Sequence, residues 1–170
     1  MNKIEMPQIY KNVYISFEIA IAACLCFLFG FYVSDILHSG QSIIGGFWCL
    51  ITVSTILQMS TKESYSAAYQ ILIGSVIGGV TAFILASFLG YSYYVMIFAV
   101  AISVFITASF GFDSAIKMSS ANAGVIIALG LYQPDYSPLI NSSLRLIETF
   151  SGTAIALFFI FISKILMIRK

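Results

Sequence analysis

Residues 65–89 read YSAAYQILIGSVIGGVTAFILASFL and contain no Asp, Glu, Lys or Arg. The hydrocarbon core of a membrane is about 30 Å thick, and a helix of about 20 apolar residues crosses it. Within lipid the backbone must satisfy its own hydrogen bonds, so only helices and closed barrels span the core. An apolar run of this length, without the alternation of a barrel strand, predicts a transmembrane helix.

The rest of the chain has the same character. Sixty per cent of its 170 residues are apolar and only 9% are charged, whereas a soluble domain carries about a quarter charged residues. We therefore expect one all-α domain over residues 1–170, a polytopic membrane protein whose main partner is the lipid bilayer. The six predicted transmembrane helices cover residues 14–33, 43–59, 65–89, 93–112, 115–132 and 144–168.

The basic residues divide unequally between the two sides of this plan. With the N-terminus in the cytoplasm, all but one of the 8 Lys and Arg residues fall inside or at inner helix ends. These residues are Lys3, Lys11, Lys62, Lys117, Lys164, Arg169 and Lys170. The excess of positive charge predicts a multi-pass protein of the bacterial inner (plasma) membrane with both termini cytoplasmic.

Arg145 is the exception, and it lies three residues before Glu148 in the last predicted helix. A helix places two such residues on one face. In hydrocarbon these charges are costly unless they are paired, hydrated or facing other protein. One interpretation makes Arg145 the group that attracts an anion, with Glu148 as its partner or as a switch that protons titrate. The alternative is a mutual salt bridge, with Arg145 extending to the outer headgroups.

Three other residues are candidates for the same pathway. Glu18 lies in the first predicted helix and is the kind of carboxylate that proton-coupled carriers use; the alternative is a hydrated residue at the inner interface. Trp48 and Thr52 lie in the second predicted helix, where an aromatic ring and a hydroxyl would line a pore. The alternative for the hydroxyl is a bond back to its own helix. The predicted substrate-binding residues are Arg145, Glu148, Glu18, Trp48 and Thr52.

A shift of the sequence by 74 residues lays the first three predicted helices on the last three. Gly78 then falls on Gly152, and Ser75 falls on Thr149. Because each half has three helices, a duplication would make the halves inverted in the membrane, a plan common among transporters. Two inverted three-helix repeats and an unduplicated bundle both remain open at this point.

Other chemistry is not indicated. The three cysteines lie in apolar runs without the spacing of metal ligands. No His, Asp and Cys cluster points to catalysis, because the single histidine, His38, lies in an outer connector. We therefore expect no enzyme activity, no cofactor, no metal and no nucleic-acid partner.

Residues 47–53, 71–78 and 145–152 form three motifs that resemble those of the fusaric acid resistance protein-like family of aromatic acid exporters. Phe47 to Val53 resembles its W-x-x-(I/L)-T element, and Ile71 to Gly78 resembles R-x-x-G-T-x-x-G. Arg145 to Gly152 is similar to R-x-x-E-T-x-x-G near the last helix of the six-helix membrane unit. The resemblance departs from the family at Ile71, which stands where the family has arginine, and in the missing cytosolic domain.

The resemblance implies an inner-membrane exporter of aromatic or other organic carboxylic acids, driven by the proton gradient. A similar six-helix unit in plant malate channels implies the alternative of an organic-anion channel. The third alternative is a non-transporting membrane scaffold or partner subunit, which the missing arginine favours. We expect at least a homodimer, because one six-helix unit offers little interface for a pathway. A separate soluble or periplasmic partner would replace the missing domain.

Overall fold

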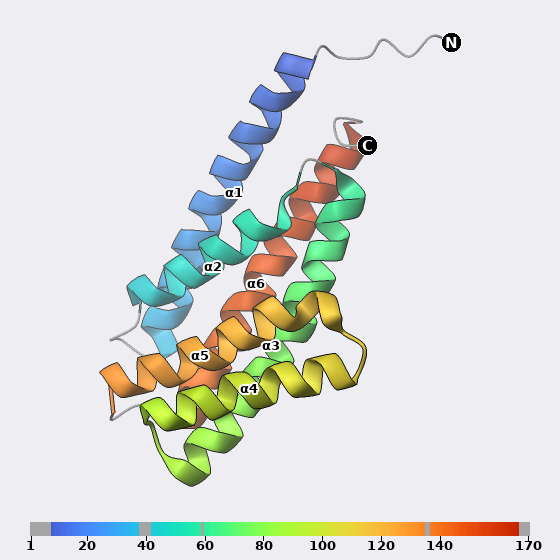
Figure 1. Cartoon of the computed structure of the whole chain (residues 1–170). Helices are drawn as coiled ribbons and strands as arrows, with labels where there is room; N and C mark the ends of the chain where they lie inside the picture. The colour runs from blue at the N-terminus through green and yellow to red at the C-terminus, as the bar shows by residue number, and fades with distance from the viewer. Residues whose placement is uncertain (1–7, 38–41, 59, 135–136, 167–170) are drawn as a thin grey trace.

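The computed structural model describes residues 8–37, 42–58, 60–134 and 137–166, which form six α-helices (Figure 1). The prediction of an all-α protein with six helices is confirmed. A single 3-10 turn, η1, precedes the fifth helix. The elements are α1 (Gln8–Leu37), α2 (Ser42–Ile56), α3 (Thr61–Leu89), α4 (Tyr93–Ser109), η1 (Asp113–Ala115), α5 (Ile116–Tyr132) and α6 (Pro138–Ile165).

The lengths and compositions of these helices are those of a multi-pass membrane protein. Four helical segments are long and apolar enough to cross a membrane: α1, α3, α6, and α5 together with η1. The other two apolar helices are shorter, α2 with 15 residues and α4 with 17. At 1.5 Å per residue α2 is about 22 Å long, less than the thickness of the hydrocarbon core.

Several helix ends lie away from the ends of the apolar runs. The sixth helix begins at Pro138 rather than at residue 144, because proline suits the first turn of a helix, whose N–H groups have no intrahelical acceptor. The third begins at Thr61 rather than at residue 65, since the Ser60 side chain accepts a hydrogen bond from the Glu63 amide and caps the helix. A search for apolar runs misses both starts, because residues 61–64 are polar and residues 141–143 interrupt the apolar run of the sixth helix.

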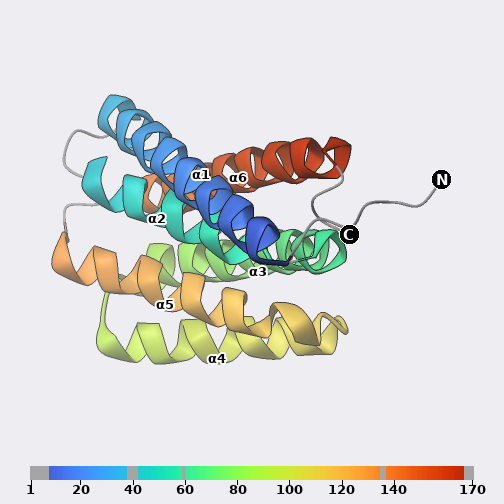
Figure 2. The ribbon, with the colours of Figure 1, turned by 90° about the horizontal axis from the view of Figure 1, so that it is seen from above.

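Two helices form the centre of the bundle, and the other four flank them. α3 packs against α6; α2 and α1 lie against α6 on one side, and α5 and α4 lie against α3 on the other (Figure 2). Small residues permit this packing. A methyl group on Gly78 of α3 would collide with the Ser119 carbonyl of α5, and one on Gly152 of α6 would lie 2.9 Å from Thr52 Cβ of α2.

The polarity of the bundle is reversed relative to a soluble protein. Large apolar side chains cover the outside; Phe88 and Phe105 are typical, with 84% and 71% of their surface exposed. Buried positions include many hydroxyl groups, and several of these donate to a carbonyl one turn earlier in their own helix, as Thr81 and Thr153 do. This arrangement suits lipid, because apolar side chains face the hydrocarbon while polar groups find partners inside.

Successive helices alternate in sense, so in the view of Figure 2 their connectors gather at two ends, although Figure 1 shows α2, α4 and α5 crossing α1, α3 and α6 at a wide angle. The start of α1, the end of α6 and the α2–α3 and α4–α5 connectors share one end. The basic residues of the described ranges at this end are Lys11, Lys62, Lys117 and Lys164. Lys3, Arg169, Lys170 and His38 lie outside the described residues. The grouping of charge along the sequence is therefore also a grouping in space.

Candidate functional site

Arg145 and Glu148 form a buried ion pair on α6. Arg145 Nη2 lies 2.8 Å from Glu148 Oε1, and each residue has only 1% of its surface exposed. The helical spacing of three residues brings the two side chains together, as the sequence indicates. The guanidinium lies inside the protein, so Arg145 does not extend to the headgroups.

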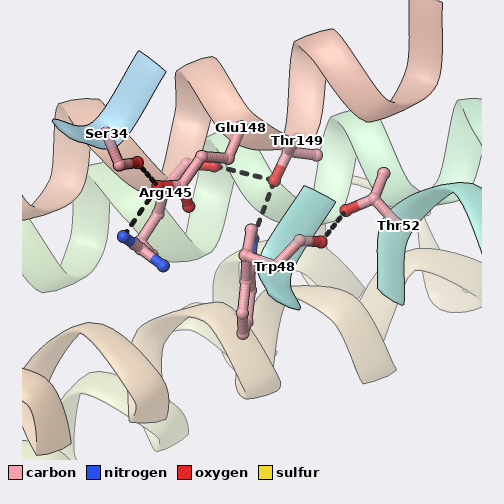
Figure 3. A network of polar contacts seen from close by, with 6 residues as sticks. All are labelled: Ser34, Trp48, Thr52, Arg145, Glu148 and Thr149. Atoms are coloured by element: carbon pink, nitrogen blue, oxygen red, sulfur yellow. Dashed lines mark hydrogen bonds and ion pairs between the residues drawn. The ribbon is translucent and has the colours of Figure 1, made fainter. Parts of the chain in front are cut away.

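A serine from α1 completes the environment of Glu148 (Figure 3). Ser34 Oγ donates a hydrogen bond of 2.7 Å to Oε1 of Glu148, the oxygen that also accepts from Arg145. Gly45 of α2 makes room for this contact, because a methyl group there would collide with Ser34 Oγ and lie 2.7 Å from Glu148 Oε1. Three helices therefore meet at one carboxylate oxygen.

Trp48 brings an aromatic ring to the same place. The Arg145 Cζ atom lies 5.9 Å from the centroid of the Trp48 ring, within the range of a cation–π interaction. The ring is held in orientation because its Nε1 donates to Thr149 Oγ1 at 3.0 Å. Thr149 in turn donates to the carbonyl of Arg145 at 2.8 Å. Figure 3 shows Arg145 and Trp48 pointing to the same side of α6.

Thr52 lies one turn further along α2, beside this group. Its hydroxyl donates to the Trp48 carbonyl at 2.9 Å, which is the bond back to its own helix that the sequence left as an alternative. Its Cβ packs against Gly152 of α6. In this structure Thr52 therefore fixes the α2–α6 contact beneath Trp48.

Glu18 lies elsewhere. It is 5% exposed and accepts a hydrogen bond of 2.7 Å from Ser163 Oγ near the C-terminal end of α6. Ser34, the partner of Glu148, lies 16 residues further along α1, about 24 Å away at the helical rise. The structure thus brings Arg145, Glu148 and Trp48 together, and it places Glu18 near the opposite end of the α1–α6 contact.

Ser34 and Gly45 were missed by the sequence interpretation, which assigned Ser34 to a connector. One signal was present. Ala22, Cys26, Gly30 and Ser34 follow each other at intervals of four, and all are buried on the face of α1 that meets its neighbours. A stripe of small residues at this spacing marks a helix interface. Its last member therefore belongs to the helix, and Ser34 does.

A second, uncharged polar cluster connects α3, α4 and α5. Asn122 Nδ2 of α5 donates to Ser75 Oγ of α3, and Thr107 Oγ1 of α4 donates to Ser119 Oγ of α5 at 2.9 Å. All four residues are buried. The 74-residue shift was the available signal, because it places Asn122 on Trp48 and Ser75 on Thr149.

A shallow pocket of about 500 Å³ opens at the end of the bundle nearest to Arg145. It is lined by Ala86, Ser87, Gly90, Tyr91, Pro134 and Pro138. The Tyr91 ring covers Gly130, where a methyl group would collide with it. Burial raises the pKa of Tyr91 above its usual value, so the hydroxyl remains protonated. Asn141, one helical turn before Arg145, donates from Nδ2 to the Ile126 carbonyl of α5 at 2.8 Å.

In residues 8–37, 42–58, 60–134 and 137–166, no group of three His, Cys, Asp or Glu side chains could hold a metal ion. The cysteines of these ranges, Cys24, Cys26 and Cys49, are free thiols. The site brings together a cation, a carboxylate and an aromatic ring, and the two charged side chains are buried.

The family model described as "Fusaric acid resistance protein-like" matches residues 21–159, which include every residue of the Arg145 site. No curated protein and no solved structure matches the chain.

Proposed function

Since the chain belongs to the fusaric acid resistance protein-like family, we propose that it exports aromatic or other organic carboxylic acids through the inner membrane, coupled to the proton gradient. The family is associated with efflux and resistance, and the chain is a multi-pass membrane protein. The observation that carries the proposal is the arginine buried in the bundle beside a carboxylate and an aromatic ring.

Energetics argue against a purely structural role for this arginine. A buried ion pair recovers little more than the cost of removing its charges from water, and apolar residues of similar volume pack at least as stably. Within a membrane, ionisable groups mark pathways for ions, protons and substrates. Arg145 is 1% exposed and paired with Glu148, so both side chains are already dehydrated when a substrate arrives.

In this proposal each site residue has a separate role. Arg145 attracts the carboxylate of the substrate, Glu148 exchanges a proton, and the Trp48 ring lies beside an aromatic substrate. Thr52 holds α2 against α6 below Trp48. Glu18, with its Ser163 partner, is a second titratable carboxylate at the other end of the α1–α6 contact.

We propose a topology in which both termini are cytoplasmic. Lys11, Lys62, Lys117 and Lys164 share one end of the bundle, and positive charge is retained on the cytoplasmic side of bacterial membranes. Arg145 and the pocket at Tyr91 then lie toward the outer side. In this orientation Glu18 faces the cytoplasmic half of the membrane.

Two inverted three-helix repeats are proposed as the origin of the fold. Exchange of α1 with α4, α2 with α5 and α3 with α6 converts every contacting pair of these helices into another contacting pair. The α2–α6 contact becomes α5–α3, the α1–α6 contact becomes α4–α3, and α3–α6 becomes itself. Such exchange symmetry is expected for a pseudo-two-fold axis lying in the membrane plane.

Side chains support the same exchange. The bond from Trp48 to Thr149 has its counterpart 74 residues away in the bond from Asn122 to Ser75. A buried stripe of α1 ending at Ser34 resembles a stripe of α4 ending at Thr107, at a shift one residue shorter than 74. Its members are Val95, Ala99, Ser103 and Thr107, again at intervals of four. The repeats differ at the charged positions, because Ile71 and Gly74 stand where α6 has Arg145 and Glu148.

That difference is also the observation that favours the alternative of a non-transporting scaffold or partner subunit. Each chain has one Arg145–Glu148 site, and its counterpart in the other repeat, around Ser75 and Asn122, is uncharged. A homodimer would supply a second charged site. The organic-anion channel is the remaining alternative, with Arg145 selecting the anion. A separate soluble or periplasmic protein is a proposed partner in either case.

Reconstitution into liposomes tests transport. The purified chain should release trapped benzoate when a proton gradient is applied, and Arg145→Ala should reduce the rate at least tenfold. Lys164→Ala is the matched control, because Lys164 is an exposed basic residue on the same helix. If Arg145→Ala and the unsubstituted chain transport every carboxylate equally, Arg145 has no part in the mechanism. If neither releases any carboxylate, the scaffold alternative is favoured.

A further inference from the structure

The pocket beside Tyr91 lies about two turns of α6 away from the Arg145–Glu148 ion pair. It opens at the end of the bundle opposite the described lysines, and its lining includes Gly90 and Tyr91 of the α3–α4 connector and Pro138 of α6. Asn141 lies one helical turn beyond Pro138, and Arg145 lies one turn beyond Asn141. At the helical rise the distance along α6 from Pro138 to Arg145 is about 10 Å.

The Tyr91 side chain lies between this pocket and α5. Its ring lies against Gly130, where the three atoms nearest to an added methyl group all belong to that ring. The residue is partly exposed, yet its hydroxyl oxygen is buried, so the side chain points into the bundle. Among the described residues this hydroxyl has no hydrogen-bond partner. Tyr91 therefore presents a polar group to the interior from the wall of the pocket.

Asn141 offers the next polar group on the way to Arg145. Its surface is 0% exposed, and its Nδ2 donates to the Ile126 carbonyl of α5 at 2.8 Å. Its Oδ1 has no hydrogen-bond partner in the part of the chain that the structure describes. Ile126 lies one turn before Gly130, so Tyr91 and Asn141 contact successive turns on one face of α5.

Two such groups are not expected in a purely structural contact. A buried hydroxyl or amide normally has a partner, and ordered water supplies it where protein does not. Water is retained where several polar groups converge, and a tyrosine hydroxyl and an asparagine amide are such groups. A ring that served only to cover Gly130 would not need the hydroxyl, since phenylalanine has the same ring. The arrangement suits a hydrated passage that a side chain closes.

We propose that Tyr91 is the gate of an anion route that leads from the pocket past Asn141 to Arg145. The route rests on the transport proposed above, and an organic carboxylate is its cargo. When the Tyr91 ring leaves Gly130, its hydroxyl and the second N–H of the Asn141 amide become donors to the carboxylate, while Oδ1 of Asn141 accepts from accompanying water. When the ring returns, the Arg145 site is closed from this end.

Fluorescence of Trp48 reports whether an anion reaches the site, because Trp48 is the single tryptophan of the chain and lies beside Arg145. The probe is iodide, a water-soluble anion that quenches tryptophan on contact, and the full chain is held in lipid nanodiscs. Tyr91→Ala removes the gate and should raise the quenching constant by about twofold or more. Tyr93→Ala is the matched control: Tyr93 is an exposed tyrosine of α4, and its variant should keep the unsubstituted constant.

Gly130→Ala tests the same gate from the opposite side. The added methyl group would occupy the place of the Tyr91 ring, so the ring must move and the quenching should rise again. Gly124→Ala on the same helix is the control, because a methyl group there meets only Val100 Cγ2 at 3.4 Å. An unchanged quenching constant in either Tyr91→Ala or Gly130→Ala would overturn the inference. If one of these two variants does not fold, the other decides.

Tyr91→Phe separates the hydroxyl from the ring. The ring still covers Gly130, so iodide quenching should keep the unsubstituted value. Benzoate release from liposomes should slow about three- to tenfold, the usual effect of one lost hydrogen bond. The affinity for benzoate, measured by Trp48 fluorescence, should not change, because the hydroxyl acts on the route and not at Arg145. Release at the unsubstituted rate would overturn the part assigned to the hydroxyl.

The proposed function and the gate fail in different ways. Absence of carboxylate release from every chain, with iodide quenching that still depends on Tyr91, would remove the proposed function and leave the anion route intact. Release of benzoate by the unsubstituted chain, with quenching that does not depend on Tyr91, would leave the function and remove the gate.

Discussion

Gly45 holds the most constrained position around the ion pair. Its α-carbon faces the Ser34 hydroxyl and the Glu148 carboxylate, both of which come within contact distance of where a methyl group would lie. The absence of a side chain on α2 is therefore what allows α1 and α6 to share a hydrogen bond at this level. Gly45 therefore affects both the packing of α2 and the hydrogen bond between Ser34 and Glu148.

Gly45→Ala should destabilise the protein by about 1–3 kcal/mol, because an added methyl group in a tightly packed interior forces its neighbours to move. Gly124→Ala is the matched control. A methyl group there would meet only Val100 Cγ2 at 3.4 Å, and replacement of a helical glycine by alanine is otherwise favourable. Equilibrium unfolding in mixed micelles measures both. Equal stability of the two variants would contradict the tight contact at Gly45.

The sequence predicted the residues of this site unequally. Arg145 and Glu148 were found because a charged pair inside an apolar run is conspicuous, and their pairing follows from helical geometry alone. Ser34 lies 114 residues away from Glu148 in the chain. A serine at the end of an apolar run has no local feature that tells which carboxylate it meets. Contacts between helices depend on the packing of the whole bundle.

At the scale of the helix, adjacent glycines of α3 have different neighbours. Gly78 faces the backbone carbonyl of Ser119 on α5, whereas Gly79 faces the flexible side chain of Leu146 on α6, whose nearest atom would lie 3.4 Å from an added methyl group. The α3–α5 contact is therefore a contact of backbones, and the α3–α6 contact at this level is one of side chains.

Gly78→Ala should consequently weaken the bundle more than Gly79→Ala, by about 1–3 kcal/mol, because a backbone cannot move aside as a leucine can. The two variants have the same change in composition and helix propensity. Thermal unfolding of the purified variants in one detergent gives the comparison. A Gly79→Ala variant less stable than Gly78→Ala would show that the α3–α5 distance is not the limiting contact.

The existence of the helices could be predicted, but their ends and contacts could not. Apolar runs locate each helix because the requirement to satisfy backbone groups in lipid is strong and local. The first turn of α3 is polar, and residues 141–143 of α6 interrupt its apolar run, so hydrophobicity does not mark the start of either helix. Which faces meet is set by small residues such as Gly78 and Gly152, and small residues are also common on faces that meet lipid.

At the scale of the whole molecule, the alternating sense of the helices divides the bundle into two ends of different charge. Four described lysines occupy one end, while Arg145 lies inside the bundle toward the other. The orientation in the membrane follows from this asymmetry if the charged end stays in the cytoplasm.

Cysteine labelling in intact cells tests that orientation. The background is a chain whose Cys24, Cys26 and Cys49 are replaced by serine. In this background Tyr93→Cys should react with a membrane-impermeant maleimide, because Tyr93 is exposed at the α3–α4 end. Lys62→Cys in the same background should react with the maleimide only after the cells are permeabilised. The reverse result would place the termini outside.

The short length of α2 has a consequence for the lipid around it. A helix of 15 residues ends before the hydrocarbon does, so lipids that touch its exposed residues, Ile43, Phe47 and Ile51, must compress or tilt to match it. Hydrophobic mismatch therefore acts on the same helix that carries Trp48 and Gly45. The acyl-chain length of the host membrane becomes a mechanical influence on the candidate site, independent of any ligand.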